Sequence, residues 1–239
     1  DRESLNHGPA RLSKSLQASV LFPTWSWARR AYGRWMFASY DQALATRDSV
    51  KRRHLVTSAW FQERWPLQIT TDQNQKTYFE NEAQGYMLAT SVKGHGTGQH
   101  PDMFVGDDLQ DAQAAASAQE RLTTREWYKH TLATRGAGRG IRKVVIMQRL
   151  NEEDIAAYLL DLGFEHLMLP MRYEPSRART TVIGFRDPRT EAGELLDQVR
   201  YPEPVVAKLE ETLGPYHTAG QLQQRPSPAG GGLIKRNWF

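Results

Sequence analysis

The sequence contains no cysteine. This absence excludes disulfide bonds, zinc sites built on thiolates and cysteine nucleophiles, and it is typical of proteins in a reducing compartment. No apolar run approaches the roughly 18–20 residues that a membrane-spanning helix needs. The seven histidines show no His-Glu-x-x-His or other zinc-ligand spacing, so the sequence predicts no zinc site. The first residues lack the apolar core of a signal peptide and do not begin with Met, so we expect the natural start to lie upstream.

The chain also has little net charge for its size. It has 31 Lys plus Arg against 27 Asp plus Glu, which gives +4 over 239 residues. Such a weak basic excess permits a polyanionic partner without requiring one. Hydrophobic residues make up 39%, which excludes an intrinsically disordered chain and predicts one large domain, or a domain with an appendage.

Apolar periodicity predicts strands and helices in alternation, which favours an α/β fold with a mostly parallel central sheet flanked by helices. Prolines become frequent after residue 173. We therefore predict a core over residues 1–172 and a smaller lid or linker region over 173–239. The expected strands are 34–40, 76–79, 86–92, 103–106 and 142–147, and the expected helices are 14–30 (kinked near Pro23), 41–55, 112–133, 152–162 and 205–213.

A near match to a phosphate-binding loop runs from Gly8 to Ser15. In the pattern G-x-x-x-x-G-K-[ST], backbone N–H groups hold phosphate oxygens, the lysine reaches the β- and γ-phosphates, and the hydroxyl binds Mg²⁺. Lys14 and Ser15 match, but Ser13 replaces the second glycine. The alternative is a Ser-Lys-Ser helix start in which Ser13 is only an N-cap. The residues before Gly8 do not form an apolar run, so we expect the strand that precedes such a loop to be missing.

An apolar run over residues 103–106 leads directly into Asp107 and Asp108. Ligands of open α/β sheets bind at the carboxyl ends of the strands, which is where these side chains should lie. The first carboxylate can hold Mg²⁺ and the second can activate the attacking water. The alternative is that both begin a solvated loop or cap a helix.

The strand expected over 142–147 is followed by Gln148 and Arg149. An amide and a cation at a strand end suit the sensing of a γ-phosphate, since the amide can contact phosphate or water and the cation can offset charge. The alternative is a strand end with both side chains in solvent.

Together these segments resemble the large subunit of tailed-phage terminases, the motor that packages DNA into a capsid. The segment 8–15 looks like its Walker A loop, where Arg11 precedes Lys14 by three residues as is frequent in that family. Val105-Gly-Asp-Asp looks like its Walker B strand and Ile146-Met-Gln-Arg-Leu-Asn-Glu-Glu-Asp like its coupling motif. Further landmarks follow in the family's order: Phe22-Pro-Thr-Trp, Ala38-Ser-Tyr-Asp-Gln-Ala-Leu-Ala-Thr-Arg-Asp-Ser, Asp72-Gln-Asn, Gly94-His-Gly-Thr-Gly, Leu222-Gln-Gln-Arg-Pro-Ser-Pro and Ile234-Lys-Arg-Asn-Trp-Phe.

The resemblance implies a P-loop ATPase of the additional-strand (ASCE) type that hydrolyses ATP with Mg²⁺. By carry-over, Gly8, Arg11, Ser13, Lys14 and Ser15 would bind nucleotide. Ser15 and Asp107 would hold the metal, Lys14 and Asp108 would be catalytic, and Gln148 would couple hydrolysis to movement. The implied partners are double-stranded DNA, the portal of the procapsid and the terminase small subunit, in a homo-oligomeric ring in the host cytoplasm with no membrane role. The family's nuclease would follow Phe239, so we expect this chain not to cleave DNA.

Two departures from the family pattern matter. Ser13 adds a Cβ where the backbone approaches phosphate closely. No arginine finger precedes the Walker B segment, where Lys93 is the nearest cation. The other candidates for a trans-acting or DNA-contacting cation are Arg135, Arg139 and Arg149.

The densest basic stretches, 51–53 and 135–143, are further candidates for DNA contact, the alternatives being a solvated helix face and a loop. Two other functions stay open. One is a helicase-like DNA-translocating ATPase. The other is a degenerate P-loop module that docks without hydrolysing nucleotide.

Overall fold

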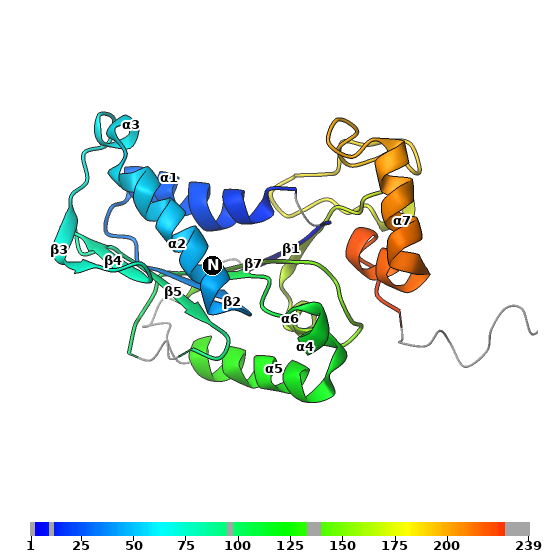
Figure 1. Ribbon diagram of the computed structural model, residues 1–239, viewed down its shortest axis with the longest axis horizontal. Helices are drawn as coiled ribbons and strands as arrows, with labels where there is room; N and C mark the ends of the chain where they lie inside the picture. The colour runs from blue at the N-terminus through cyan, green and yellow to red at the C-terminus, as the bar shows by residue number, and fades with distance from the viewer. Residues whose placement is uncertain (1–2, 10–11, 95–97, 133–139, 228–239) are drawn as a thin grey trace, which may run out of the picture. The chain divides into compact units, whose positions relative to one another are not determined.

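The computed structural model describes residues 3–9, 12–94, 98–132 and 140–227 (Figure 1). They divide into two units. The first contains Ser13–Gln110 and Leu122–Ile146 together with Glu3, and the second contains Ser4–Leu12, Asp111–Arg121 and the part of the chain from Met147 onward. The boundary predicted at residue 172 stays a prediction.

The described residues of the first unit carry six strands in the spatial order β3-β4-β5-β2-β6-β7. Neighbouring strands from β5 to β7 pair in parallel, whereas β3, β4 and β5 pair in antiparallel fashion. The prediction of a mixed α/β fold with a mostly parallel sheet is therefore confirmed. The strands are β2 (Trp35–Ser39), β3 (Ile69–Asn74), β4 (Tyr78–Asn81), β5 (Tyr86–Ser91), β6 (Met103–Asp107) and β7 (Arg142–Met147).

Helices cover both faces of this sheet (Figure 1). On one face lie α1 (Phe22–Arg29) and α2 (Gln42–Thr57), with the short α3 (Ala59–Gln62) after α2. On the other face α5 packs its Trp127 and Tyr128 against Phe104 of β6. The next residue, Val105, belongs to the core on the α1 face with Trp27 and Phe37, as the alternation of side chains along a strand requires.

The helix predicted over 112–133 is two helices, α4 (Ala112–Ala116) and α5 (Ala118–Leu132). Ser117 breaks it with an extended backbone (φ −86°, ψ 121°), and its hydroxyl accepts a hydrogen bond from Glu120 N. A serine at this position competes with the helix for backbone partners and starts a new first turn, because its side chain is a good N-cap. Composition alone did not show the break.

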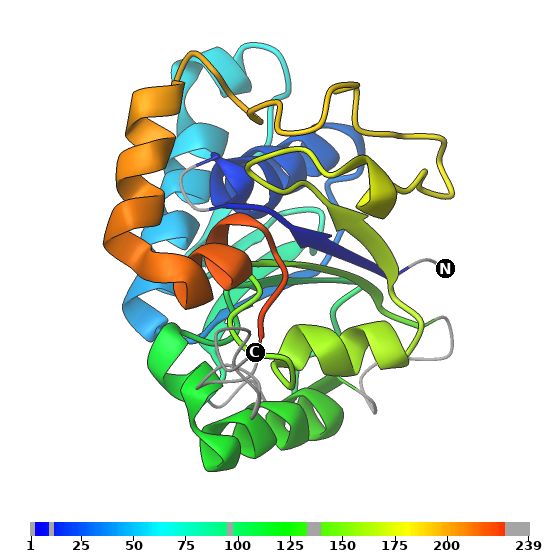
Figure 2. The same ribbon diagram turned by 90° about the vertical axis from the view of Figure 1, so that its right-hand side faces the viewer.

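A strand does precede Gly8, contrary to our expectation. Ser4–His7 forms β1, which pairs in parallel with β8 (Glu165–Met168) in the second unit; Figure 2 shows the two side by side. Leu5 and His7 are buried and alternate with half-buried neighbours. Buried and half-buried residues alternate along this strand with a period of two. A search for continuous apolar residues therefore misses it.

The rest of the second unit is helical and irregular. It contains α6 (Ile155–Asp161), the 3₁₀ turn η2 (Pro175–Arg177), α7 (Glu203–His217) and the π-helical turn η3 (Thr218–Leu222). Asp154 caps α6 by accepting from Ala157 N. A small core of Met171, Leu195, Val206 and Leu222 holds α7 and η3 to the preceding loops. Among the described residues no helix combines the length and the apolar character needed to cross a membrane.

A pair of histidines joins β1 to β8. Nδ1 of His7 and Nε2 of His166 lie 2.9 Å apart, with the rings in an edge-to-face arrangement. Burial, together with the positive charges of Arg149, Arg179 and Arg177, lowers the pKa of His166 to about 4. The ring is therefore neutral in the folded protein at neutral pH.

We expect the free energy of unfolding to fall as the pH drops from 6.5 toward 4. In this range the unfolded chain binds a proton at His166 that the folded chain excludes, so the stability present above pH 6.5 is lost on acidification. Because the ring is partly exposed, we expect a loss of about 1–2 kcal/mol rather than the full pKa difference. Urea unfolding at several pH values measures it. His166→Gln should flatten this slope, and His54→Gln at an exposed helix position should not; an unchanged slope in His166→Gln would contradict the assignment.

Candidate functional site

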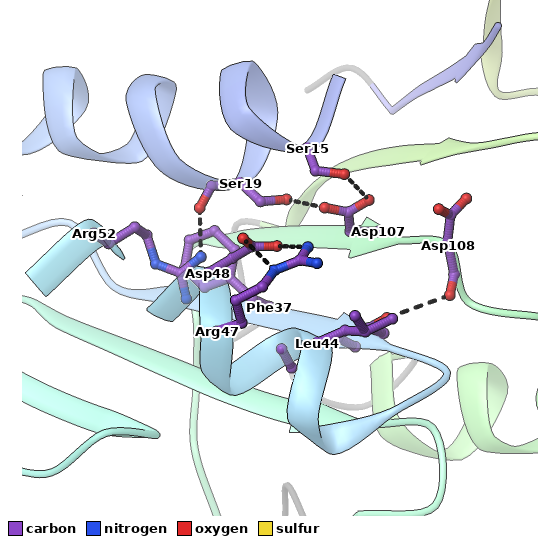
Figure 3. Close-up of a pocket in the computed structure, with 12 residues that line it drawn as sticks. Ser15, Ser19, Phe37, Leu44, Arg47, Asp48, Arg52, Asp107 and Asp108 are labelled. Carbon is purple, nitrogen blue, oxygen red and sulfur yellow. Dashed lines mark hydrogen bonds and ion pairs between the residues drawn. The ribbon is translucent and has the colours of Figure 1, made fainter. Parts of the chain in front are cut away.

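The two sequence segments predicted to bind nucleotide and metal meet in the first unit. The hydroxyl of Ser15 donates to Oδ1 of Asp107 at 2.9 Å, although the residues are 92 positions apart (Figure 3). Ser19, one turn further along the same helix, donates to Oδ2 at 2.7 Å. Two hydroxyls from one helix face therefore hold both oxygens of the carboxylate that ends β6.

The two aspartates lie on the same side of the sheet. Successive side chains of a strand normally point to opposite faces. Asp108 departs from this rule because its backbone is left-handed (φ 47°), and both carboxyl groups rise on the side of Ser15 (Figure 3). Neighbouring strands hold this conformation, since Asp108 N donates to Ile146 O and Asp108 O accepts from Tyr40 N, both at 2.9 Å. The fold thus brings two carboxylates to one ligand-facing edge.

Lys14 lies at the same edge. Burial lowers the pKa of its ammonium, and the negative charges of Asp108 and Asp107 oppose that effect. Burial likewise raises the pKa of Asp107, against the hydrogen bonds from Ser19 and Ser15. Burial thus destabilises the charged forms of both Lys14 and Asp107, and their opposite charges compensate each other in part. An anionic, metal-bearing ligand would satisfy both, because it supplies negative charge to the lysine and positive charge to the carboxylate.

Ser13 adopts the backbone that the missing glycine of the phosphate loop would favour. Its φ is 61°, and its carbonyl accepts the first helical hydrogen bond, from Gln17 N at 2.9 Å. For a residue with a Cβ the left-handed conformation costs roughly 1–2 kcal/mol. The substitution of serine for glycine therefore leaves the loop conformation in place and adds strain to it.

We expect Ser13→Gly to raise the free energy of unfolding by about 1 kcal/mol and to tighten nucleotide binding, because it removes this strain and the Cβ. Ser13→Ala retains the Cβ and serves as the matched control, so it should show neither gain. Thermal unfolding and titration with a fluorescent ADP measure both effects. A Ser13→Gly variant that is less stable than Ser13→Ala would show that the serine hydroxyl, not the backbone, matters here.

A cavity of about 40 Å³ lies beneath the carboxylate of Asp107, between the helix of Ser15 and Ser19, strand β2 and helix α2 (Figure 3). Asp48 of α2 lines it and pairs with Arg47 and Lys51 at 2.9 and 3.0 Å. Burial alone would raise the pKa of Asp48, but the hydrogen bonds from these two cations outweigh it and the pKa is lowered. Asp48 is therefore an ionised carboxylate whose negative charge is balanced by the two neighbouring cations.

The basic stretch 51–53 is not a continuous positive surface. Lys51 pairs with Asp48, Arg52 is completely buried in the wall of the cavity, and Arg53 donates to the carbonyl and side chain of Asn74. DNA contact by Arg52 is excluded by its burial. The residue has turned inward because position 52 falls on the face of α2 that packs against the helix carrying Ser19.

The remaining predicted residues are placed as follows. Gly8 follows β1 directly and is buried, and Gln148 follows the last residue of β7. Arg149 forms an ion pair with Asp154, whose side chain is completely buried, so its guanidinium is occupied in holding the turn before α6. Lys93 is exposed after β5. Arg11, Arg135 and Arg139 lie outside the described residues, so their predicted roles stay predictions.

Sequence reasoning missed Ser19 and Arg52. Ser19 had a usable signal, because it stands four residues after Ser15 and must share its helix face. Arg52 had none that separates it from Arg53. Only the packing of α2 shows which of the two guanidinium groups is buried.

Comparison with known proteins identifies the fold. No protein-family model matches the chain, and no curated protein matches it in sequence. Two solved structures of the large terminase of a thermophilic bacteriophage match it. The first has 10% sequence identity and a TM-score of 0.55, and the match covers 98% of this chain and 52% of that chain. The second, a complex with ADP, has 10% sequence identity and a TM-score of 0.52, and the match covers 92% of this chain and 47% of that chain. The large terminase of bacteriophage HK97 matches with 14% identity and a TM-score of 0.53 over 93% and 46%.

The chain therefore spans about half the length of the solved structures it matches. At such low identity the likeness concerns the backbone arrangement, which agrees with the mostly parallel sheet and its flanking helices. The chain has the mixed α/β fold of the phage large terminases.

Proposed function

We propose that this chain is the nucleotide-hydrolysing motor part of a phage large terminase. The observation that carries the proposal is the hydrogen bond from Ser15 to Asp107, which joins the phosphate-loop candidate to the acidic strand end. Two motifs that are weak alone and lie 92 residues apart thus meet within a fold that large terminases share, which supports the proposal. A similar structure was solved in complex with ADP, which supports a nucleotide as the ligand class.

The residues present suit Mg²⁺ and ATP. Mg²⁺ prefers hard oxygen ligands and commonly takes one or two from the protein while phosphates and water complete its shell. Ser15 Oγ and Asp107 offer such oxygens at 2.9 Å from each other, and Lys14 provides an adjacent cation. When bound, the metal would neutralise charge that develops on the phosphate oxygens.

We assign each of the chain's own residues at the site a separate role in hydrolysis. The ammonium of Lys14 binds phosphate oxygens and stabilises their charge. Ser15 and Asp107 form the protein's part of the metal site. Asp108 orients the attacking water and accepts its proton, for which the left-handed backbone has turned its carboxylate toward the ligand side. Hydrolysis needs no covalent intermediate on the protein.

Coupling to DNA is the second half of the proposal. Gln148, directly after β7, would relay the state of the γ-phosphate, and the work done would be translocation of double-stranded DNA into a procapsid. In this proposal the motor assembles as a homo-oligomeric ring in the host cytoplasm. It works there with the portal of the procapsid and with the terminase small subunit. The strained Ser13 favours one competing interpretation, a module that binds or docks without hydrolysing nucleotide.

We expect the chain to hydrolyse ATP in the presence of Mg²⁺, and Lys14→Ala to lose at least tenfold in nucleotide affinity, because the buried ammonium interacts electrostatically with both carboxylates and would bind phosphate oxygens. Phosphate release with and without DNA and titration with fluorescent ADP measure the two effects. Lys51→Ala is a matched control, since that lysine pairs with Asp48 on α2. If the chain binds ADP but hydrolyses no ATP in any condition, the result favours the docking module. If Lys14→Ala binds ADP as tightly as the wild-type chain, the assignment of Lys14 to the nucleotide site is wrong.

A further inference from the structure

Arg52 is a buried cationic side chain at the site that the proposed chemistry does not use. It is 0% exposed, and its guanidinium stacks over the ring of Phe37 at 3.5 Å from the ring centre. Nη1 donates to the carbonyl of Ser19, whereas Nε and Nη2 have no hydrogen-bond partner in the part of the chain that the structure describes. A buried guanidinium with two unsatisfied nitrogens is costly, so packing alone does not account for it.

The carbonyl that Arg52 holds is one that a regular α-helix would leave open at this position. In an α-helix the carbonyl of Ser19 would accept from the N–H of residue 23, but that residue is Pro23, which has no N–H. The chain passes this point as a π-helical turn, η1 (Leu16–Leu21), in which Phe22 N donates to Gln17 O. The predicted kink at Pro23 is thus a change of helix type, and Arg52 donates to the Ser19 carbonyl beside it.

Ser19 connects this bond to the metal-binding carboxylate. Its backbone carbonyl accepts from Arg52, and its hydroxyl donates to Oδ2 of Asp107 at 2.7 Å. A shift of Ser19 would therefore release one of the two hydroxyls that hold Asp107. Burial lowers the pKa of Arg52 to about 9, and the negative charges of Asp48 and Asp107 partly oppose that effect.

We propose that Arg52 is a positioning residue that acts through Ser19 to hold the Asp107 carboxylate in its orientation for Mg²⁺. This inference rests on the proposed function. It assigns to a residue outside the phosphate loop and the acidic strand the task of donating to a carbonyl that, in a regular α-helix, would face the N–H that Pro23 lacks.

The first test separates metal binding from nucleotide binding. In Arg52→Met the side chain keeps its length and apolar stem but loses its donors and charge, and a similar hydrophobic side chain is often tolerated at a buried ionic position. ADP affinity is measured with Mg²⁺ and with EDTA. We expect the gain in affinity that Mg²⁺ confers to fall about tenfold or more, as for other residues that orient a metal ligand, with little change in EDTA. Arg52→Lys, which retains one donor, should recover part of the gain, and Arg53→Met is the control on the neighbouring position.

The second test asks whether the Ser19 carbonyl is the point of action. Pro23→Ala restores an N–H four residues after Ser19, so the double variant Pro23→Ala/Arg52→Met should regain Mg²⁺ dependence relative to Arg52→Met alone. Equal loss of ADP affinity in Mg²⁺ and EDTA would overturn the proposal in favour of a general structural role, as would failure of both Arg52→Met and the double variant to fold. A wild-type Mg²⁺ effect in Arg52→Met would overturn it directly. Absence of ADP binding in the wild-type chain would instead refute the proposed function.

Discussion

Asp108→Asn should lower the rate of ATP hydrolysis by about 10²–10⁴-fold and leave ADP affinity nearly unchanged, because it removes the group that accepts the proton of the attacking water. Asparagine has the same shape as aspartate and tolerates the left-handed backbone that Asp108 adopts at φ 47°. The substitution therefore tests the carboxylate without adding backbone strain. Single-turnover hydrolysis and ADP titration measure the two quantities.

Asp107→Asn is the matched comparison at the neighbouring position. It should reduce the dependence of nucleotide affinity on Mg²⁺, because its oxygens are the ones that Ser15 and Ser19 orient. If Asp108→Asn hydrolyses ATP at the wild-type rate, the base lies elsewhere. If both variants lose ADP binding equally, the two carboxylates act together in binding rather than in separate roles.

Gly85→Ala should lower the free energy of unfolding by about 3 kcal/mol. Gly85 closes the turn between β4 and β5, and a Cβ there would lie 1.9 Å from the carbonyl oxygen of Ala31. The contact is with backbone, so no side-chain rotation relieves it. Asn81, which is completely buried, bridges the same carbonyl and the N–H of Gly85 and would be displaced with it. Urea unfolding monitored by tryptophan fluorescence measures the loss.

Gln84→Gly in the same turn is the control for this prediction. Gln84 has φ 65°, so glycine removes strain and the variant should be as stable as the wild-type chain or more stable by about 1 kcal/mol. A Gly85→Ala variant with unchanged stability would mean that the loop carrying Ala31 moves away freely, and that the hairpin is not held by that contact.

The order of elements followed from local pattern. The run at 103–106 became β6, the strands expected over 76–79 and 86–92 became the antiparallel pair β4 and β5, and the segment at 41–55 became α2 with Asp41 as its N-cap. The predictions were wrong where the sequence does not separate apolar from polar segments clearly. β1 alternates polar and buried residues, and Ser117 interrupts a stretch whose composition is helical throughout.

The candidate site could be predicted as a set of residues but not as a geometry. The spacing from Gly8 to Ser15 and the pair Asp107-Asp108 at a strand end predict the chemistry, because those residue types in that order suit phosphate and Mg²⁺. Ser19, the second hydroxyl on Asp107, needed the helix register as well. The Ser15–Asp107 contact itself depends on where the sheet places β6 beside the helix.

The sequence by itself determined which residues can do phosphate chemistry and that a parallel α/β sheet presents them, since residue type and periodicity are local properties. Tertiary structure decided the rest. Pairing on both sides of Asp108 holds a left-handed backbone that puts two successive carboxylates on one side, which no strand does alone. Helix packing likewise decided that Arg52 and not Arg53 is buried, where it donates to the backbone carbonyl of Ser19. Both outcomes arise from contacts between segments distant in sequence, which local patterns do not encode.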